Sequence, residues 1–215
     1  MKSSFLAGIV LGLFAALGAA RFYPWIDHVR VASRTTVLHN GGRLENFVIR
    51  LPVDRIASSG TPETGLRGRA FPEQATLPDA IGGGVLAEHF KLRDVDGEVI
   101  GIAARHSAIV DGVPTSAWAL SIPSRGTMRL VGSAEPGELD RALAAEGRTE
   151  GRAWTGQLAM TIGADDAQSG WITGGSHEFD GLGGAYTEQW AISGVSQSGE
   201  LRGTISLQTT AEYAL

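Results

Sequence analysis

Residues 86–106, LAEHFKLRDVDGEVIGIAARH, set the fold of most of this chain. Apolar and polar residues alternate on both sides of the centre of this stretch, which is the period of a half-buried strand. Between the two runs stands Asp96-Gly97, a pair that readily adopts the positive φ angles of a tight hairpin turn. The stretch therefore predicts an antiparallel hairpin, with strands over residues 86–93 and 98–106.

The same pattern recurs on both sides of this hairpin. Towards the N-terminus, Asn40-Gly41-Gly42 is a second turn signal. Towards the C-terminus, clusters of Gly, Pro, Asp and Ser separate further short apolar runs. The predicted strands outside the central hairpin cover residues 29–39, 43–51, 115–122, 127–131, 152–162, 171–179, 185–193 and 200–210. A short helix is expected near residues 135–146, where acidic residues open an apolar run that Gly147 ends.

Strands joined by short turns must lie antiparallel to their neighbours. The predicted fold class is mainly β, an antiparallel meander, and we favour an up-and-down β-barrel over a two-sheet β-sandwich. Residues 52–84 interrupt the pattern, because they hold four prolines and show no sustained period of 2 or 3.6. We expect a long irregular loop there, of the kind that often forms a lid or a binding loop.

Residues 5–20, FLAGIVLGLFAALGAA, form an apolar run without charge or proline. A helix needs about 20 residues to cross a bilayer, so this run is at the short end of that range. We favour an uncleaved signal anchor over residues 1–25, because Tyr23 and Trp25 suit the membrane interface. Residues 26–215 then form one β-rich domain in the bacterial periplasm, held by a single-pass helix in the inner membrane. The alternative is secretion after signal-peptide cleavage before Arg21.

Small residues recur every fourth position on one face of this apolar run, at Gly8, Gly12 and Ala16. Such a face lets a second membrane helix approach closely. Chance is the competing explanation in a segment so rich in Ala and Gly. The spacing nevertheless predicts a possible contact with a membrane-protein complex.

The composition excludes several classes of protein. The chain has no cysteine, which removes disulfides, thiol catalysis and Cys-type zinc sites. A net charge of −5 argues against a nucleic-acid partner, which requires a basic surface. Five histidines occur without metal-site spacing, so no metal or cofactor is predicted.

Three titratable residues fall on faces of the predicted strands that are otherwise apolar: Glu88, His106 and Glu188. Four aromatic residues share these inner faces and predict a cavity lining for a small apolar ligand: Trp118, Trp154, Tyr186 and Trp190. The alternative is purely structural, since a carboxylate inside a barrel can pair with arginine and a histidine at a strand end is often solvated.

Two hypotheses for function follow. The first is a non-catalytic envelope module, anchored in the membrane, that binds a hydrophobic ligand or serves as an accessory subunit. The absence of a nucleophile elbow and of other catalytic motifs favours it. The second is an envelope enzyme, such as a hydratase, an isomerase or a glycan-acting enzyme. It would use Glu88, Glu188 and His106 for acid–base chemistry and requires that these side chains converge on one pocket.

Overall fold

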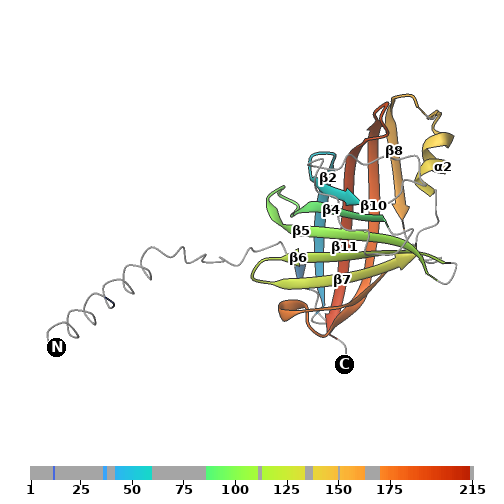
Figure 1. Cartoon of the computed structure of the whole chain (residues 1–215). Helices are drawn as coiled ribbons and strands as arrows, with labels where there is room; N and C mark the ends of the chain where they lie inside the picture. The colour runs from blue at the N-terminus through green and yellow to red at the C-terminus, as the bar shows by residue number, and fades with distance from the viewer. Residues whose placement is uncertain are drawn as a thin grey trace, which may run out of the picture.

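The computed structural model describes Gly12 and residues 36–37, 42–59, 86–110, 113–133, 138–149, 151–162 and 170–213. Eight of the strands in these ranges close into an antiparallel barrel (Figure 1). The barrel strands are β2 (Arg43–Leu51), β4 (Leu86–Arg93), β5 (Val99–Val110), β6 (Val113–Ile122), β7 (Gly126–Ser133), β9 (Gly170–Gly175), β10 (Leu182–Val195) and β11 (Leu201–Tyr213).

Each barrel strand pairs with the next one along the chain, and β11 pairs with β2. The contact of Val48 with Arg93, between β2 and β4, completes the ring. This order is that of an up-and-down meander, so the predicted barrel is confirmed and the sandwich is wrong. In Figure 1 the strands β5, β6 and β7 cross β2, β10 and β11 at a large angle, as tilted strands on opposite walls of a barrel do.

Three further strands extend the sheet. The strand β1 (Thr36–Val37) pairs with the start of β2, and β3 (Arg55–Ser59) pairs with β4. The strand β8 (Trp154–Ile162) lies beside the second half of β10, while β9 lies beside the first half of the same edge. The helix α2 (Glu138–Ala145) contacts β8 and confirms the predicted helix.

Two predictions about secondary structure need correction. The expected irregular loop at 52–84 contains β3, which forms because the edge of β4 offers it unpaired backbone groups. Residues 52–54 form a turn before β3, and the rest of that loop, from residue 60 to residue 84, lies outside the described residues. The strand predicted at 171–179 ends at Gly175, and residues His177–Phe179 form the short 3-10 helix η1.

The two ends of the barrel differ. At one end, which we call the turn end, tight connections join β4 to β5 and β6 to β7, and η1 joins β9 to β10. The other end is called the crossover end. The connection from β7 to β9, with α2 and β8, lies there, and β3 runs towards this end along β4. Most of the predicted inner faces meet inside this barrel. Its core includes Phe47, Ile49, Phe90, Leu92, Trp118, Leu120, Met128, Leu130, Trp190, Ile192, Ile205 and Leu207.

Adjacent glycines on β10 provide a matched test of the β10–β11 pairing. Gly184 has a φ of +133°, and a Cβ there would collide with the carbonyl oxygen of Thr210, whereas a Cβ at Gly183 would meet no atom within 4 Å. We expect Gly184→Ala to lower the free energy of unfolding by about 1–3 kcal/mol. Gly183→Ala should change it by less than about 0.5 kcal/mol. Urea unfolding followed by tryptophan fluorescence measures both, and equal losses would contradict the register.

The predicted membrane anchor at 1–25 lies outside the described residues except for Gly12, whose backbone is helical. In the part of the chain that the structure describes, no helix has both the length and the apolar character needed to cross a membrane. Gly8 and Ala16 are likewise outside the described residues.

Candidate functional site

Glu188 is the centre of a polar cluster inside the barrel. It lies on β10 and is only 1% exposed. Its two carboxylate oxygens accept hydrogen bonds from two indole N–H groups, that of Trp190 at 2.7 Å and that of Trp118 at 2.8 Å. A buried carboxylate needs such partners, because an unpaired one costs several kcal/mol. Two of the four predicted cavity residues thus bind the predicted acidic group.

Arg105 joins Glu188 to the second predicted carboxylate, Glu88. Its Nη2 lies 3.8 Å from Glu188 Oε1, and its Nη1 lies 3.5 Å from Glu88 Oε2. The guanidinium lies 5.7 Å from the centre of the Trp118 ring and 5.1 Å from that of Trp190, within the range of cation–π attraction. Arg105 Nε also donates to Ser116 Oγ at 3.2 Å.

A second arginine completes this group. Arg55, on β3, donates to Glu88 Oε1 at 3.0 Å and lies over the ring of Phe90. We call Arg55, Glu88, Arg105, Trp118, Glu188 and Trp190 the interior cluster. Its two cations and two anions alternate, so the charges balance inside the barrel. The cluster lies in the half of the barrel near the crossover end, where β4 begins.

His106 does not belong to this cluster, and its predicted inward orientation is wrong. Between β4 and β5 the register changes, because Leu92 pairs with Gly101 but Arg93 pairs with Val99. This bulge inserts one residue into β5 and exchanges its two faces from there on. Ile102 is therefore exposed, and Arg105 points inwards in place of His106.

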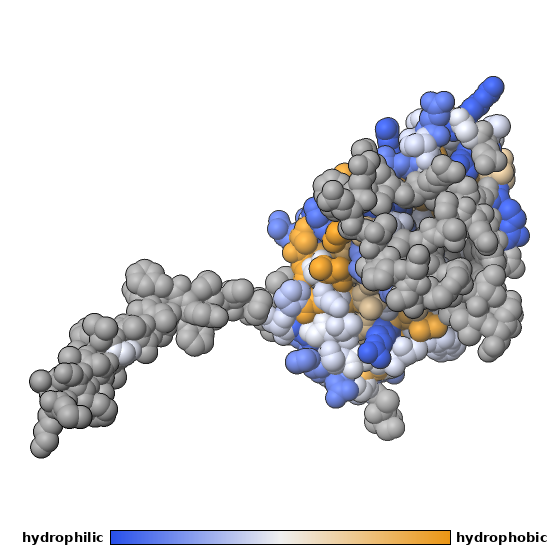
Figure 2. All heavy atoms as spheres, in the orientation of Figure 1, coloured by the Kyte–Doolittle hydropathy of each residue, from blue (hydrophilic) through white to orange (hydrophobic). Residues whose placement is uncertain are grey.

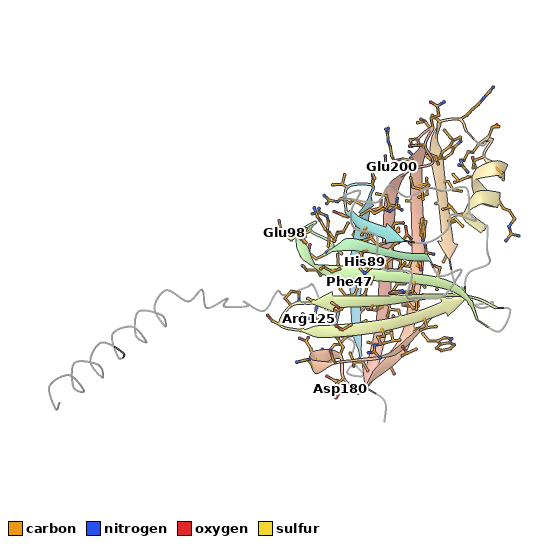
Figure 3. The ribbon with its side chains drawn as sticks, viewed as in Figure 1. Phe47, His89, Glu98, Arg125, Asp180 and Glu200 are labelled. Carbon is orange, nitrogen blue, oxygen red and sulfur yellow. The ribbon has the colours of Figure 1, made fainter. Side chains whose placement is uncertain are left out.

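His106 lies instead on the outer face, beside His89 of the neighbouring strand. The two rings meet edge to face with their centres 6.4 Å apart. Figure 3 marks His89 on β4. The three residues that the enzyme hypothesis requires are thus not brought together, since Glu88 and Glu188 are inside the barrel and His106 is outside.

Trp154 is the predicted cavity residue that the structure places elsewhere. It lies on β8, beyond the barrel wall, and its indole N–H donates to the carbonyl oxygen of Glu146 at 3.2 Å. An open hollow of about 600 Å³ lies beside it, lined by β8, the end of β10 and Arg202. Sequence reasoning could not separate β8 from the barrel, because β8 alternates in the same way as the barrel strands.

Tyr186 faces the interior next to Glu188. Burial raises the pKa of Tyr186, and the negative charge of Glu188 raises it further. Up to about pH 10, the ordinary pKa of tyrosine, both folded and unfolded chains keep the phenol protonated. Above this pH the unfolded chain loses the proton first, so the free energy of unfolding should fall as the pH rises.

We therefore expect Tyr186 to remain protonated in the folded chain while exposed tyrosines ionise. Absorbance at 295 nm, recorded from pH 9 upwards with and without denaturant, measures this difference. In Tyr186→Phe the difference should disappear, together with part of the alkaline loss of stability. Ionisation of all tyrosines near pH 10 in the folded chain would contradict the burial of this phenol.

A second cluster closes the turn end. Arg125, in the β6–β7 turn, is only 1% exposed and binds both oxygens of Glu45 at 2.8 Å. Its Nη2 also donates to Glu178 at 3.2 Å, and its guanidinium lies 4.9 Å from the ring centre of Phe179. Figure 3 shows Arg125 near this end and Glu200 at the far end of the molecule.

The electrostatics of Arg125 follow from these contacts. Burial alone would lower its pKa, but the hydrogen bonds and charges of Glu45 and Glu178 outweigh burial and raise that pKa. Arg43 extends the cluster towards solvent, since it binds Glu178 at 3.2 Å and the hydroxyl of Tyr213 at 3.0 Å. Sequence reasoning missed Arg125, because a lone arginine in a turn carries no signal of burial.

The described part of the chain offers no group of three or more His, Cys, Asp or Glu side chains suited to a metal ion. Comparison with models of protein families and with curated proteins finds no match to the chain.

Proposed function

We propose that this chain is a non-catalytic, extracytoplasmic β-barrel module that is tethered to the bacterial inner membrane and serves as an accessory subunit of a membrane complex. One observation carries the proposal. The interior carboxylates Glu88 and Glu188 are bound by arginines and indole N–H groups of the chain itself. The interior cluster therefore connects strands of the barrel by hydrogen bonds and ion pairs, and its polar groups are already paired within the chain. The outer surface and the anchor are then the parts that can contact a partner.

The location in the periplasm rests on the apolar run at residues 5–20 and on Lys2, which favours a cytoplasmic N-terminus. Mass spectrometry of the mature chain tests it. An intact N-terminus supports the anchor. A chain that begins at Arg21 would show a secreted protein and would contradict the tether.

The accessory role is tested by the size of the complex that the full chain forms in mild detergent. We expect the chain to migrate as part of an assembly larger than one copy in a micelle. Gly8→Ile with Gly12→Ile should release it if the small-residue face is the contact. The matched control is Val10→Ile with Phe14→Leu, on the opposite face of the predicted helix. A single copy in every sample would contradict the accessory role.

Binding of a small apolar ligand is the second candidate, and partial solvent access favours it. The side chains of Arg55, Glu88 and Arg105 retain exposures of 8–12%, next to the Trp118 and Trp190 rings. An apolar probe that enters there should change the tryptophan emission. Titration with octanol tests this, with Trp118→Phe as the comparison. A saturable change that Trp118→Phe abolishes would favour ligand binding, and a linear response would leave only the accessory role.

A further inference from the structure

Four exposed aliphatic side chains gather around the C-terminal end of β4. They are Val53, 69% exposed, and Val95, Val99 and Ile102, each 46–50% exposed. We call these four residues the hairpin patch. Figure 2 shows apolar side chains exposed on the side of the barrel that carries the β4–β5 turn. Exposed aliphatic groups that cluster in this way mark contact surfaces more often than single ones do.

The hairpin patch is held together by a buried ion pair. Asp54, next to Val53, is fully buried and accepts hydrogen bonds from the guanidinium of Arg93 at 2.7–3.0 Å. Arg93 also donates to the carbonyl oxygen of Gly97 in the β4–β5 turn at 2.7 Å. The Arg93 side chain thus binds both the turn after β2 and the β4–β5 turn. Because these two turns are held in place, the hairpin patch is a preformed surface.

Strand pairing shows where this surface lies along the chain. One edge of β2 is taken by β11, and the other edge is shared by β1, opposite Arg43 and Leu44, and by β4, opposite Val48. The β4–β5 turn follows directly on β4. The N-terminal part of the chain therefore joins the barrel on the same side as the hairpin patch.

We infer that the hairpin patch rests on the lipid surface of the membrane. This inference rests on the proposed tether. Ten residues, 26–35, separate the predicted anchor from β1 and span at most about 36 Å, so β1 stays within that distance of the membrane surface. The tether also raises the local concentration of lipid, so a weak surface is enough for stable contact.

The chemistry of the hairpin patch favours lipid over a protein partner. All four side chains are aliphatic, whereas the central residues of protein interfaces are enriched in Trp, Tyr and Arg. The exposed side chains of Arg50 and Lys91 flank the patch and can reach lipid phosphates, while Asp96 and Glu98 lie on the turn. We expect the aliphatic groups to enter the headgroup layer and the two cations to remain beside the phosphates.

The absence of cysteine from the chain allows a direct test. The full chain is labelled with an environment-sensitive fluorophore through Val95→Cys or Val99→Cys. The control label is at Gln197→Cys, an exposed position in the turn between β10 and β11, at the crossover end. Each sample is reconstituted into vesicles of phosphatidylethanolamine and phosphatidylglycerol that carry a nitroxide on the headgroup. We expect severalfold stronger quenching at positions 95 and 99 than at 197.

The other results of the quenching and flotation measurements each contradict a specific claim. Equal quenching at all three positions, or none at positions 95 and 99, overturns the lipid contact and leaves the proposed function standing. A blue shift at position 95 without nitroxide quenching shows that protein covers the patch, and it also overturns the lipid contact. Failure of the chain to float with the vesicles overturns the tether, and with it both the proposed function and this inference.

Discussion

Arg125→Ala is expected to lower the free energy of unfolding by about 3–5 kcal/mol, because it leaves the buried carboxylate of Glu45 without its bidentate partner. Both side chains are at most 2% exposed, so water cannot replace the lost guanidinium without opening the turn end of the barrel. A domain of this size has a total stability of about 5–15 kcal/mol. The change should therefore remove a large share of it, which urea unfolding will measure.

Two controls distinguish the effect of losing the ion pair on stability from the effect of losing side-chain volume. Arg202→Ala removes an exposed arginine from β11 and should cost less than about 0.5 kcal/mol. Arg125→Met combined with Glu45→Met removes both charges and should recover most of the stability, since apolar replacements of a buried pair are often neutral. A double variant as unstable as Arg125→Ala would show that packing, and not charge, holds this end closed.

Glu188→Ala should have the second largest effect, a loss of about 2–5 kcal/mol. It leaves the indole N–H groups of Trp118 and Trp190 buried without an acceptor, and each such donor costs about 1–3 kcal/mol. It also removes one of the two carboxylates near Arg105. The near-ultraviolet circular dichroism of the two indoles should weaken in the folded state, and urea unfolding gives the change in stability.

Glu188→Gln is a useful comparison for Glu188→Ala. Its amide oxygen can accept from one indole, but its NH₂ group faces the other N–H donor, so we expect an intermediate loss. Glu98→Ala, on the exposed β4–β5 turn, is the control for the removal of a carboxylate and should be nearly neutral. A Glu188→Ala variant as stable as the parent chain would contradict the central role of this carboxylate in the interior cluster.

Local chemistry was enough to predict much of the barrel. Gly97 has a φ of +90°, and its N–H donates to the Asp94 carbonyl oxygen, as the Asp-Gly signal in the central hairpin implies. Strict alternation placed Glu88 and Glu188 on the inner face, and both are buried. These predictions hold because the side-chain period of a strand is a local property of its backbone.

The partners of these residues could not be predicted in the same way. Arg105 was missed because a single extra residue at the β4–β5 bulge exchanges the faces of β5. Gly101, which lies at this bulge, was its only signal in the sequence, since a glycine inside a strand often marks a bulge. Trp154 was misplaced because β8 and the barrel strands share one pattern. Arg55 was missed because its strand is only five residues long, too short to show a period.

The sequence by itself determined the fold class, the antiparallel order and the burial of two carboxylates, since turns and alternation act over a few residues. It also supplied the predicted anchor at 1–25, which stays a prediction. Only the tertiary structure decided which cation reaches each carboxylate, that Arg125 seals the turn end, and that the hairpin patch lies beside the entry of the chain. These contacts join residues up to 135 positions apart, and they depend on register and on barrel closure, which no local pattern encodes.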